Sequence, residues 1–208
     1  MRHTAIICLL LAGAALPALA EESPIANTWI DQVARTGAAA PEPWGNVKQV
    51  YTITIGAESV VLEETAIADL AAKLGAEAHN WGEAGEAVTW ACLSRNAETL
   101  WLYSDGEMGD GKVTGVGIDV RDAAPASARC GTWPADMNAD LGLMGIGMPA
   151  DVIVGNYLTG QPDEYGWFGS INLTPAATAP FEIWQELTFR ANDEGIVNAV
   201  AVMQMTGD

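Results

Sequence analysis

The residues of this sequence that point most clearly to chemistry are Cys92 and Cys130, which could form a disulfide. The third cysteine, Cys8, lies in an N-terminal stretch that we expect to be removed. Two cysteines and the one remaining histidine, His79, are too few for a zinc site of the Cys/His type. A cysteine pair in an exported protein is instead typical of a disulfide. We therefore predict a structural Cys92–Cys130 disulfide and no metal centre.

Carboxylates gather in the stretch from Asp105 to Asp110, between two expected strands. Asp105, Glu107 and Asp110 depart from the pattern of a calcium loop, which needs acids or amides at alternate positions and a distant glutamate. Weak calcium binding by these three side chains stays open as an alternative. We interpret the stretch as an acidic hairpin that helps to orient a partner.

Motifs of common enzymes are missing from the sequence. It has no Gly-x-Ser-x-Gly nucleophile motif, no phosphate-binding loop and no dinucleotide fingerprint. We interpret His79 as a turn residue rather than a base. The adjacent acids Glu63-Glu64 and Asp163-Glu164 do not suit acid/base catalysis, because neighbours on a strand or helix do not face each other. We predict a protein that is not an enzyme and that needs no cofactor.

The charge of the chain restricts its partners. Among 208 residues there are 27 acids and 9 Lys and Arg, which gives a formal net charge of −18. Binding to nucleic acid or to an anionic membrane requires clustered cations, so both are excluded. An acidic protein is drawn to basic partners, although acidity alone also keeps a protein soluble and monomeric.

The first twenty residues have the pattern of a secretory signal peptide. Arg2 supplies the positive start, Ile6 to Leu16 is a short apolar run, and Pro17-Ala18-Leu19-Ala20 has the small residues of a cleavage site. We expect cleavage after Ala20 and a periplasmic or secreted protein. The apolar run is too short for a membrane span, and no later segment is long and apolar enough for one.

We divide the chain into a signal peptide (1–20), an N-terminal helix with a connector (21–46) and two α+β repeats (47–135 and 136–208). Helix-start residues at Ser23-Pro24 and a connector rich in Pro and Gly define the second part. In each expected repeat a short helix, before Gly75 or after Pro149, precedes a run of strands. These strands are expected near 88–93, 100–104, 113–120, 166–173, 183–189 and 196–205.

The two stretches have matching spacings. Gly75 and Gly160 are 85 residues apart, Leu100 and Ile183 are 83 apart, and Val113 and Ile196 are also 83 apart. A constant offset favours two copies of one helix-then-meander unit, the alternative being an ordinary α+β domain with coincidental spacing. The expected fold class is therefore α+β, with two layers, tandem repeats and one open face of the sheet.

Aromatic side chains are expected on that open face. Strand alternation places Trp101 and Tyr103 on the side opposite Leu100 and Leu102, and Trp184 and Glu186 on the side opposite Ile183 and Leu187. Trp and Tyr often anchor protein interfaces. The alternative is that these rings complete a second core beneath the N-terminal helix.

The segment Leu143 to Val152, LMGIGMPADV, followed by Leu158 to Pro162, LTGQP, resembles a known helix-turn signature. It is the Gly-Met-x-x-x-x-Val … Leu-Gly-x-Pro signature of the β-lactamase-inhibitor-protein-like fold, which also occurs in the small lipoprotein of the outer-membrane β-barrel assembly machinery. The resemblance covers 141–205 and, more loosely, 62–120. It implies tandem helical units packed on antiparallel sheet, a concave protein-binding surface and, in the inhibitors, an acidic hairpin inserted into an enzyme.

From these observations we predict an exported, acidic protein-binding module that acts on a basic enzyme or toxin as an inhibitor or immunity protein. The predicted contact residues are Trp101, Tyr103, Trp184, Glu186, Asp105, Glu107 and Asp110. The alternatives are an envelope-assembly accessory protein and an enzyme with an unrecognised carboxylate site.

Overall fold

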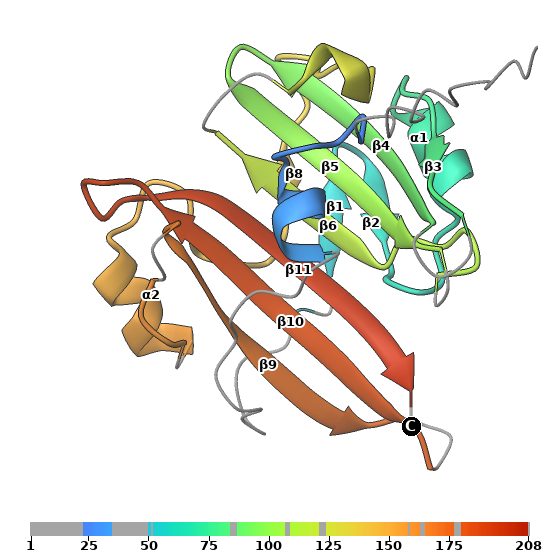
Figure 1. Cartoon of the computed structure of the whole chain (residues 1–208). Coiled ribbons are helices and arrows are strands. Elements are labelled where there is room, and N and C mark those ends of the chain that lie inside the picture. Colours follow the sequence, from blue (N-terminus) through green and yellow to red (C-terminus); the bar gives the residue numbers. More distant parts are fainter. Residues whose placement is uncertain are drawn as a thin grey trace, which may run out of the picture.

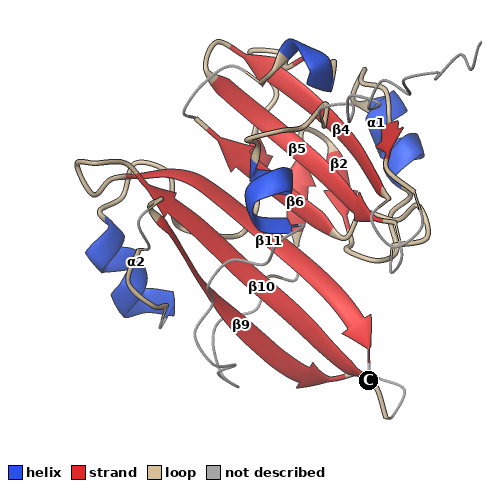
Figure 2. Cartoon of the chain, in the orientation of Figure 1, coloured by secondary structure: helices blue, strands red, loops and turns tan. Residues whose placement is uncertain are grey.

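The structure is a computed structural model that describes residues 23–34, 50, 52–83, 87–106, 109–120, 124–157, 159–162, 165–176 and 180–207. Strands make up 44% of it and helices 14% (Figures 1 and 2). The prediction of α+β repeats, each a helix followed by a sheet, is therefore wrong: the fold is all-β-like and mostly antiparallel. The helices are short and do not form a layer of their own.

One large sheet of eight strands runs through the molecule. Seven of its strands follow one another in the order β3 (His79–Trp81), β4 (Val88–Arg95), β5 (Glu98–Asp105), β6 (Gly115–Asp119), β11 (Val197–Gly207), β10 (Glu182–Ala191) and β9 (Trp167–Pro175). The short β7 (Gly131–Thr132) pairs with β4 in parallel. Because β6 pairs with β11, the two stretches that we expected to be repeats supply adjoining halves of a single sheet.

A smaller sheet and a few short helices surround the large one. The small sheet contains β1 (Ile53–Ile55), β2 (Glu58–Val60) and β8 (Ala139–Asp140). The helical elements are a π-helix, η1 (Ile30–Ala34), a 3-10 turn, η3 (Ala126–Ala128), α1 (Ile67–Lys73) and α2 (Ala150–Tyr157). Just after α1, Gly75 adopts a φ of +75°, as is common after the last turn of a helix.

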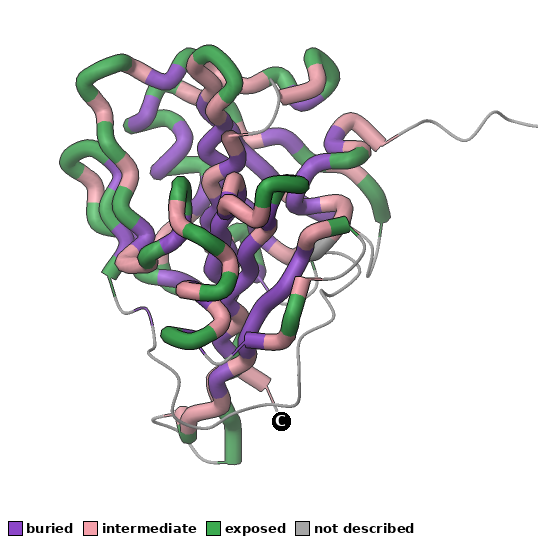
Figure 3. Tube along the Cα trace, turned by 90° about the vertical axis from the view of Figure 1, so that its left-hand side faces the viewer, coloured by how far each residue is buried: buried purple, intermediate pink, exposed green. Residues whose placement is uncertain are grey.

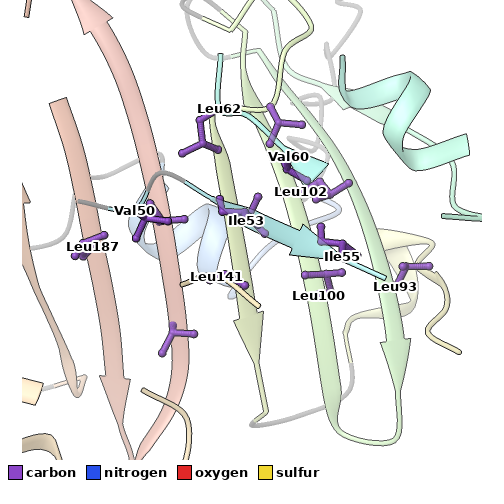
Figure 4. Close-up of a cluster of buried hydrophobic side chains, with 14 of the residues drawn as sticks. Val50, Ile53, Ile55, Val60, Leu62, Leu93, Leu100, Leu102, Leu141 and Leu187 are labelled. Carbon is purple, nitrogen blue, oxygen red and sulfur yellow. The ribbon is translucent and has the colours of Figure 1, made fainter. Parts of the chain in front are cut away.

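The first face of the large sheet carries the main core. Ile53 and Ile55 of the small sheet pack there against Leu100 and the other aliphatic residues of β4 and β5 (Figure 4). Helix α2 covers the β9–β10 end, where the Tyr157 and Phe189 ring centroids are 5.1 Å apart. The buried side chains of α2 are Ile153 and Tyr157, whereas Val152, in the segment that resembles the helix-turn signature, is half-buried. Leu158, in the second part of that signature, lies outside the described residues.

The second face of the sheet is covered over β4, β5, β6 and part of β11, so the prediction of an open face is wrong for that part of the sheet. The N-terminal segment lies over it (Figure 1, blue), with Ile25, Trp29 and Ile30 buried against the strands. Gly115 and Gly117, two residues apart on β6, leave a flat slot in which the Trp29 indole rests. A Cβ atom at Gly117 would lie only 2.9 Å from Cε3 of Trp29. The missing side chains on β6 are what allow the N-terminal segment to close this face.

The predicted disulfide is confirmed. Cys92 on β4 is bonded to Cys130, with an S–S distance of 1.98 Å and a Cα–Cα distance of 4.6 Å. The Nε1 atom of Trp90 donates a hydrogen bond to the carbonyl oxygen of Ala128 at 3.1 Å. Together these links fasten the 126–130 segment across the second face.

Candidate partner-binding surface

Two of the predicted contact residues are part of the core. Trp101 is 2% exposed and Tyr103 is 3% exposed, and both belong to the cluster beneath the N-terminal segment. Tyr103 meets Trp29 edge to face, with ring centroids 6.2 Å apart. Strand alternation does place both rings on the same face as Trp184, but a third element covers that face at β5. These two rings cannot contact a partner.

The predicted acidic hairpin is only partly described. Asp105 ends β5, where its carboxylate accepts a hydrogen bond from the Tyr103 hydroxyl at 3.1 Å and its amide donates one to Oγ1 of Thr114 at 3.0 Å. Asp110 is exposed, in a turn with a φ of +43°. Glu107 lies outside the described residues. Asp105 therefore helps to hold the end of β5, and the acidic residue of the hairpin that the structure shows at the surface is Asp110.

Trp184 is the predicted aromatic residue that does reach the surface. It is 43% exposed, and Met205, which lies opposite it on β11, is 37% exposed. On its other side Trp184 lies opposite Leu173 of β9, which is half-buried. Leu173, Trp184 and Met205 thus form one apolar row across three strands.

Two carboxylates flank this row along β10. Glu182 and Glu186 are two residues before and after Trp184, so all three side chains lie on the same face. Glu182 is exposed and Glu186 is half-buried. The Thr188 hydroxyl donates a hydrogen bond to Oε1 of Glu186 at 3.4 Å. We call the set Leu173, Glu182, Trp184, Glu186 and Met205 the Trp184 surface.

The Trp184 surface begins where the cover of the second face ends. The pairing register puts Tyr103, Gly115, Met203 and Glu186 in one row across the sheet. Met203, beside the Trp29 ring, is still buried, whereas the next residue on that face of β11, Met205, is exposed. In Figure 1, β9, β10 and β11 extend beyond the N-terminal segment, and Figure 3 shows intermediate and exposed residues around the end marked C.

A concavity lies at the opposite end of β10. It is a polar cleft of about 500 Å³. Its lining includes Gln32, Tyr165, Arg190 and Asn192, and Asp193 is the carboxylate among its described residues. The Arg190 Nε donates to the Tyr165 carbonyl oxygen at 3.0 Å. A catalytic carboxylate pair would need a second acid, which the described lining of this cleft does not provide.

His79 is not in a turn, contrary to our interpretation. It lies in β3 opposite Trp90, is buried, and its ring centroid is 5.6 Å from that of Trp90. Within the described residues, no three His, Cys, Asp or Glu side chains come together as they would around a metal ion. The helices of the described part of the chain are too short or too polar to cross a membrane.

Sequence reasoning missed the residues that decide which part of the face is open. Gly115 and Gly117 carried a usable signal, because two glycines spaced by two within a strand mark a close approach by another group. Glu182 and Met205 could have been found by extending the alternation of β10 and β11 by one step. The cover supplied by Trp29 matches the alternative that we left open for Trp101 and Tyr103, a second core beneath the N-terminal segment.

Three comparisons with known proteins gave no match: no protein-family model, no curated protein and no solved structure is similar to this chain. The resemblance to the β-lactamase-inhibitor-protein-like fold therefore stays a prediction.

Proposed function

We propose that this protein is an exported, acidic binding module whose Trp184 surface contacts a basic partner protein. The observation that carries the proposal is the apolar row of the exposed Trp184 and Met205 and the half-buried Leu173, flanked by the Glu182 and Glu186 carboxylates. Export is supported by the Cys92–Cys130 disulfide, because disulfides persist in oxidising compartments, and by the signal-peptide pattern of residues 1–20.

The chemistry of the surface favours a lysine or arginine side chain as the group that it binds. The face of an indole attracts a cation, and a carboxylate on either side adds charge-assisted hydrogen bonds. Successive same-face residues of a strand are about 7 Å apart, so one guanidinium or ammonium group on Trp184 would lie within reach of either glutamate. The apolar neighbours Leu173 and Met205 would bury the stem of that side chain.

The net charge of −18 supports the same kind of partner. Opposite charge speeds the encounter of two proteins, and like charge opposes association of this chain with another copy of itself. The proposed action is occlusion, in which the module covers a functional region of a basic enzyme or toxin.

The test is photo-cross-linking in the cells that make the protein. p-Benzoylphenylalanine is placed at position 205 instead of Met205, and at position 144 instead of Met144, an exposed methionine in the loop before α2, as the matched control. We expect one specific adduct from position 205, which disappears in the Trp184→Ala background and is not formed from position 144. A basic protein in the adduct supports the proposal.

Two results would contradict the proposal. One is an adduct from position 205 that forms equally with Trp184→Ala. The other is an adduct with an assembly component of the outer membrane whose yield does not fall between 0.05 and 0.5 M salt, since the attraction of opposite charges is screened over about 10 Å at 0.1 M. The second result would favour the envelope-assembly alternative.

A further inference from the structure

On the other face of β10 the structure has a small apolar groove. Strand alternation turns Ile183 and Gln185 away from the Trp184 surface, toward the β1–β2 hairpin. The groove between these two side chains and the hairpin has a volume of about 170 Å³. Its apolar walls are Val50, Ile53, Val60, Val61, Leu62 and Ile183, four of which are labelled in Figure 4.

The groove is a fixed feature of the fold, because hydrogen bonds hold its two sides together. The Gln185 side chain accepts a hydrogen bond from the Val50 amide at 2.6 Å and donates one to the Val50 carbonyl oxygen at 2.9 Å. It also donates to Oε1 of Gln204 at 3.2 Å, and Gln204 donates to the Glu63 carboxylate at 3.0 Å. This chain of contacts ties Val50, three residues before β1, to the C-terminal strands.

The size of the groove selects its occupant. Pockets for drug-sized ligands measure about 300 to 1,000 Å³, so this groove is too small for one. A cavity of about 150 Å³ lined by aliphatic side chains binds benzene, so a single phenyl or isobutyl group fits. Four of the walls, Val50, Ile53, Val60 and Leu62, are buried, whereas Val61 is exposed at the rim and Ile183 is half-buried.

A carboxylate lies beside the groove. Glu63 follows the wall residue Leu62 and accepts three hydrogen bonds, from the Gln204 amide, the Thr206 amide and the Thr206 hydroxyl. These donors are neutral, so they position the carboxylate without cancelling its charge. The half-buried Glu63 therefore favours a cation next to the apolar occupant.

We infer that the groove binds one apolar side chain, phenylalanine or leucine, of a basic partner segment in which a lysine or arginine is adjacent. This inference rests on the proposed function for its choice of partner. Together with the Trp184 surface, the groove would let the partner hold the β9–β10–β11 end of the sheet from both faces.

The groove itself can be tested without the partner. Phenethylamine, which combines a phenyl ring with an ammonium group, is titrated into the disulfide-bonded protein, and the methyl signal of Ile183 is followed by NMR. We expect a saturable shift, a weaker response to benzene and none to butylamine. Ile153, which is buried beneath α2, is the silent reference.

A blocking variant and a matched control make the titration specific. Val61→Trp adds a ring at the rim and should weaken phenethylamine binding at least about tenfold, whereas Met144→Trp should leave it unchanged. If circular dichroism shows that Val61→Trp is not folded, Thr174→Trp on the same groove takes its place. The absence of a saturable Ile183 shift, or equal binding by the blocked variant, would overturn the inference.

The contribution of the groove to partner binding is tested with the cross-linker at position 205, which lies on the opposite face of the sheet. Val61→Trp should lower the yield of the cross-link from position 205, although the substituted side chain lies on the other side of β10. An unchanged yield would overturn the inference and leave the proposed function intact. If position 205 gives no adduct in the protein without Val61→Trp, although phenethylamine still binds, the proposed function is contradicted and the groove remains a binding site.

Discussion

Trp184 and Met205 lie opposite each other on β10 and β11, and both are exposed, whereas Thr188 and Ala201, the equivalent pair four residues further along, are buried. The boundary between the two pairs is set by the N-terminal segment, whose Trp29 covers Gly115 and Gly117 next to Ala201 and Met203. The same sheet face therefore serves as core at one end and as candidate interface at the other.

We predict that Trp184→Ala reduces partner binding but not stability. A central aromatic residue of an interface contributes about 2 kcal/mol or more, so binding should weaken about 30-fold. An exposed substitution changes the free energy of unfolding by about 0.5 kcal/mol at most. Titration calorimetry with the partner that the cross-link identifies measures the change in affinity. Urea unfolding measures the change in the free energy of unfolding. Tyr165→Ala, which changes an exposed aromatic residue in the turn before β9, is the control that should bind normally.

Gly117→Ala should destabilise the fold by about 1–3 kcal/mol, the usual cost of overpacking a core. The new Cβ atom would meet the rigid Trp29 ring at 2.9 Å and Cβ of Ala201 at 3.2 Å. At Gly115 a Cβ atom would meet Cγ of Met203 at 3.0 Å, in a flexible side chain that can move aside, and Cη2 of Trp29 at 3.1 Å, so it approaches the indole less closely than at Gly117. Gly115→Ala should therefore cost less. Midpoints in urea unfolding that equal the native midpoint for both variants would show that Trp29 does not rest in the slot.

Removal of the disulfide should lower the free energy of unfolding by about 4 kcal/mol on the chain-entropy model. The bond closes a loop between residues 38 apart in the sequence. Urea unfolding of the Cys92→Ala/Cys130→Ala variant, with and without dithiothreitol, measures the effect. Reductant should destabilise the native protein and leave the double variant unchanged. A native protein that is insensitive to reductant would contradict the prediction.

Glu63 combines three hydrogen bonds with a strained backbone, since its φ is +63°. Glu63→Ala loses the bonds and keeps the strain, so it should cost about 2–3 kcal/mol. Glu63→Gly relieves the strain and should be about 1 kcal/mol more stable than the alanine variant. Chemical unfolding measures both, with the exposed Glu64→Ala as the neutral control. A glycine variant less stable than the alanine variant would contradict the argument.

Lys73 should titrate above its ordinary pKa of 10.5, because Glu58 accepts a hydrogen bond from its ammonium group at 2.9 Å and attracts the charge. A raised lysine pKa stabilises the fold fully below pH 10.5, and this contribution is lost as the pH rises through the folded-state value. NMR titration of the Lys73 side chain measures the shift. Glu58→Gln should lower the pKa, and so should 1 M salt, because the pair lies at the surface.

Several elements followed from local sequence patterns. The alternation of Ile183 to Phe189 predicted a strand that lies within β10, and the apolar spacing before Gly75 predicted a helix that is α1. The pairing of Cys92 with Cys130 followed from the number of cysteines, because these two remain once the expected signal peptide is removed. These features depend on hydrophobic periodicity, on turn residues and on the number of cysteines. All three can be read from a short stretch of sequence or from the composition.

The fold class and the extent of the candidate interface were decided by contacts between distant residues. Alternation put Trp101 and Trp184 on one face, but it carried no information about Trp29, whose ring covers the first and stops short of the second. Likewise, helical periodicity identified short helices without showing that the β6–β11 pairing would merge both halves into one sheet. The period of a strand determines which side chains share a face; which of them water or a partner can reach depends on what the rest of the chain packs against that face.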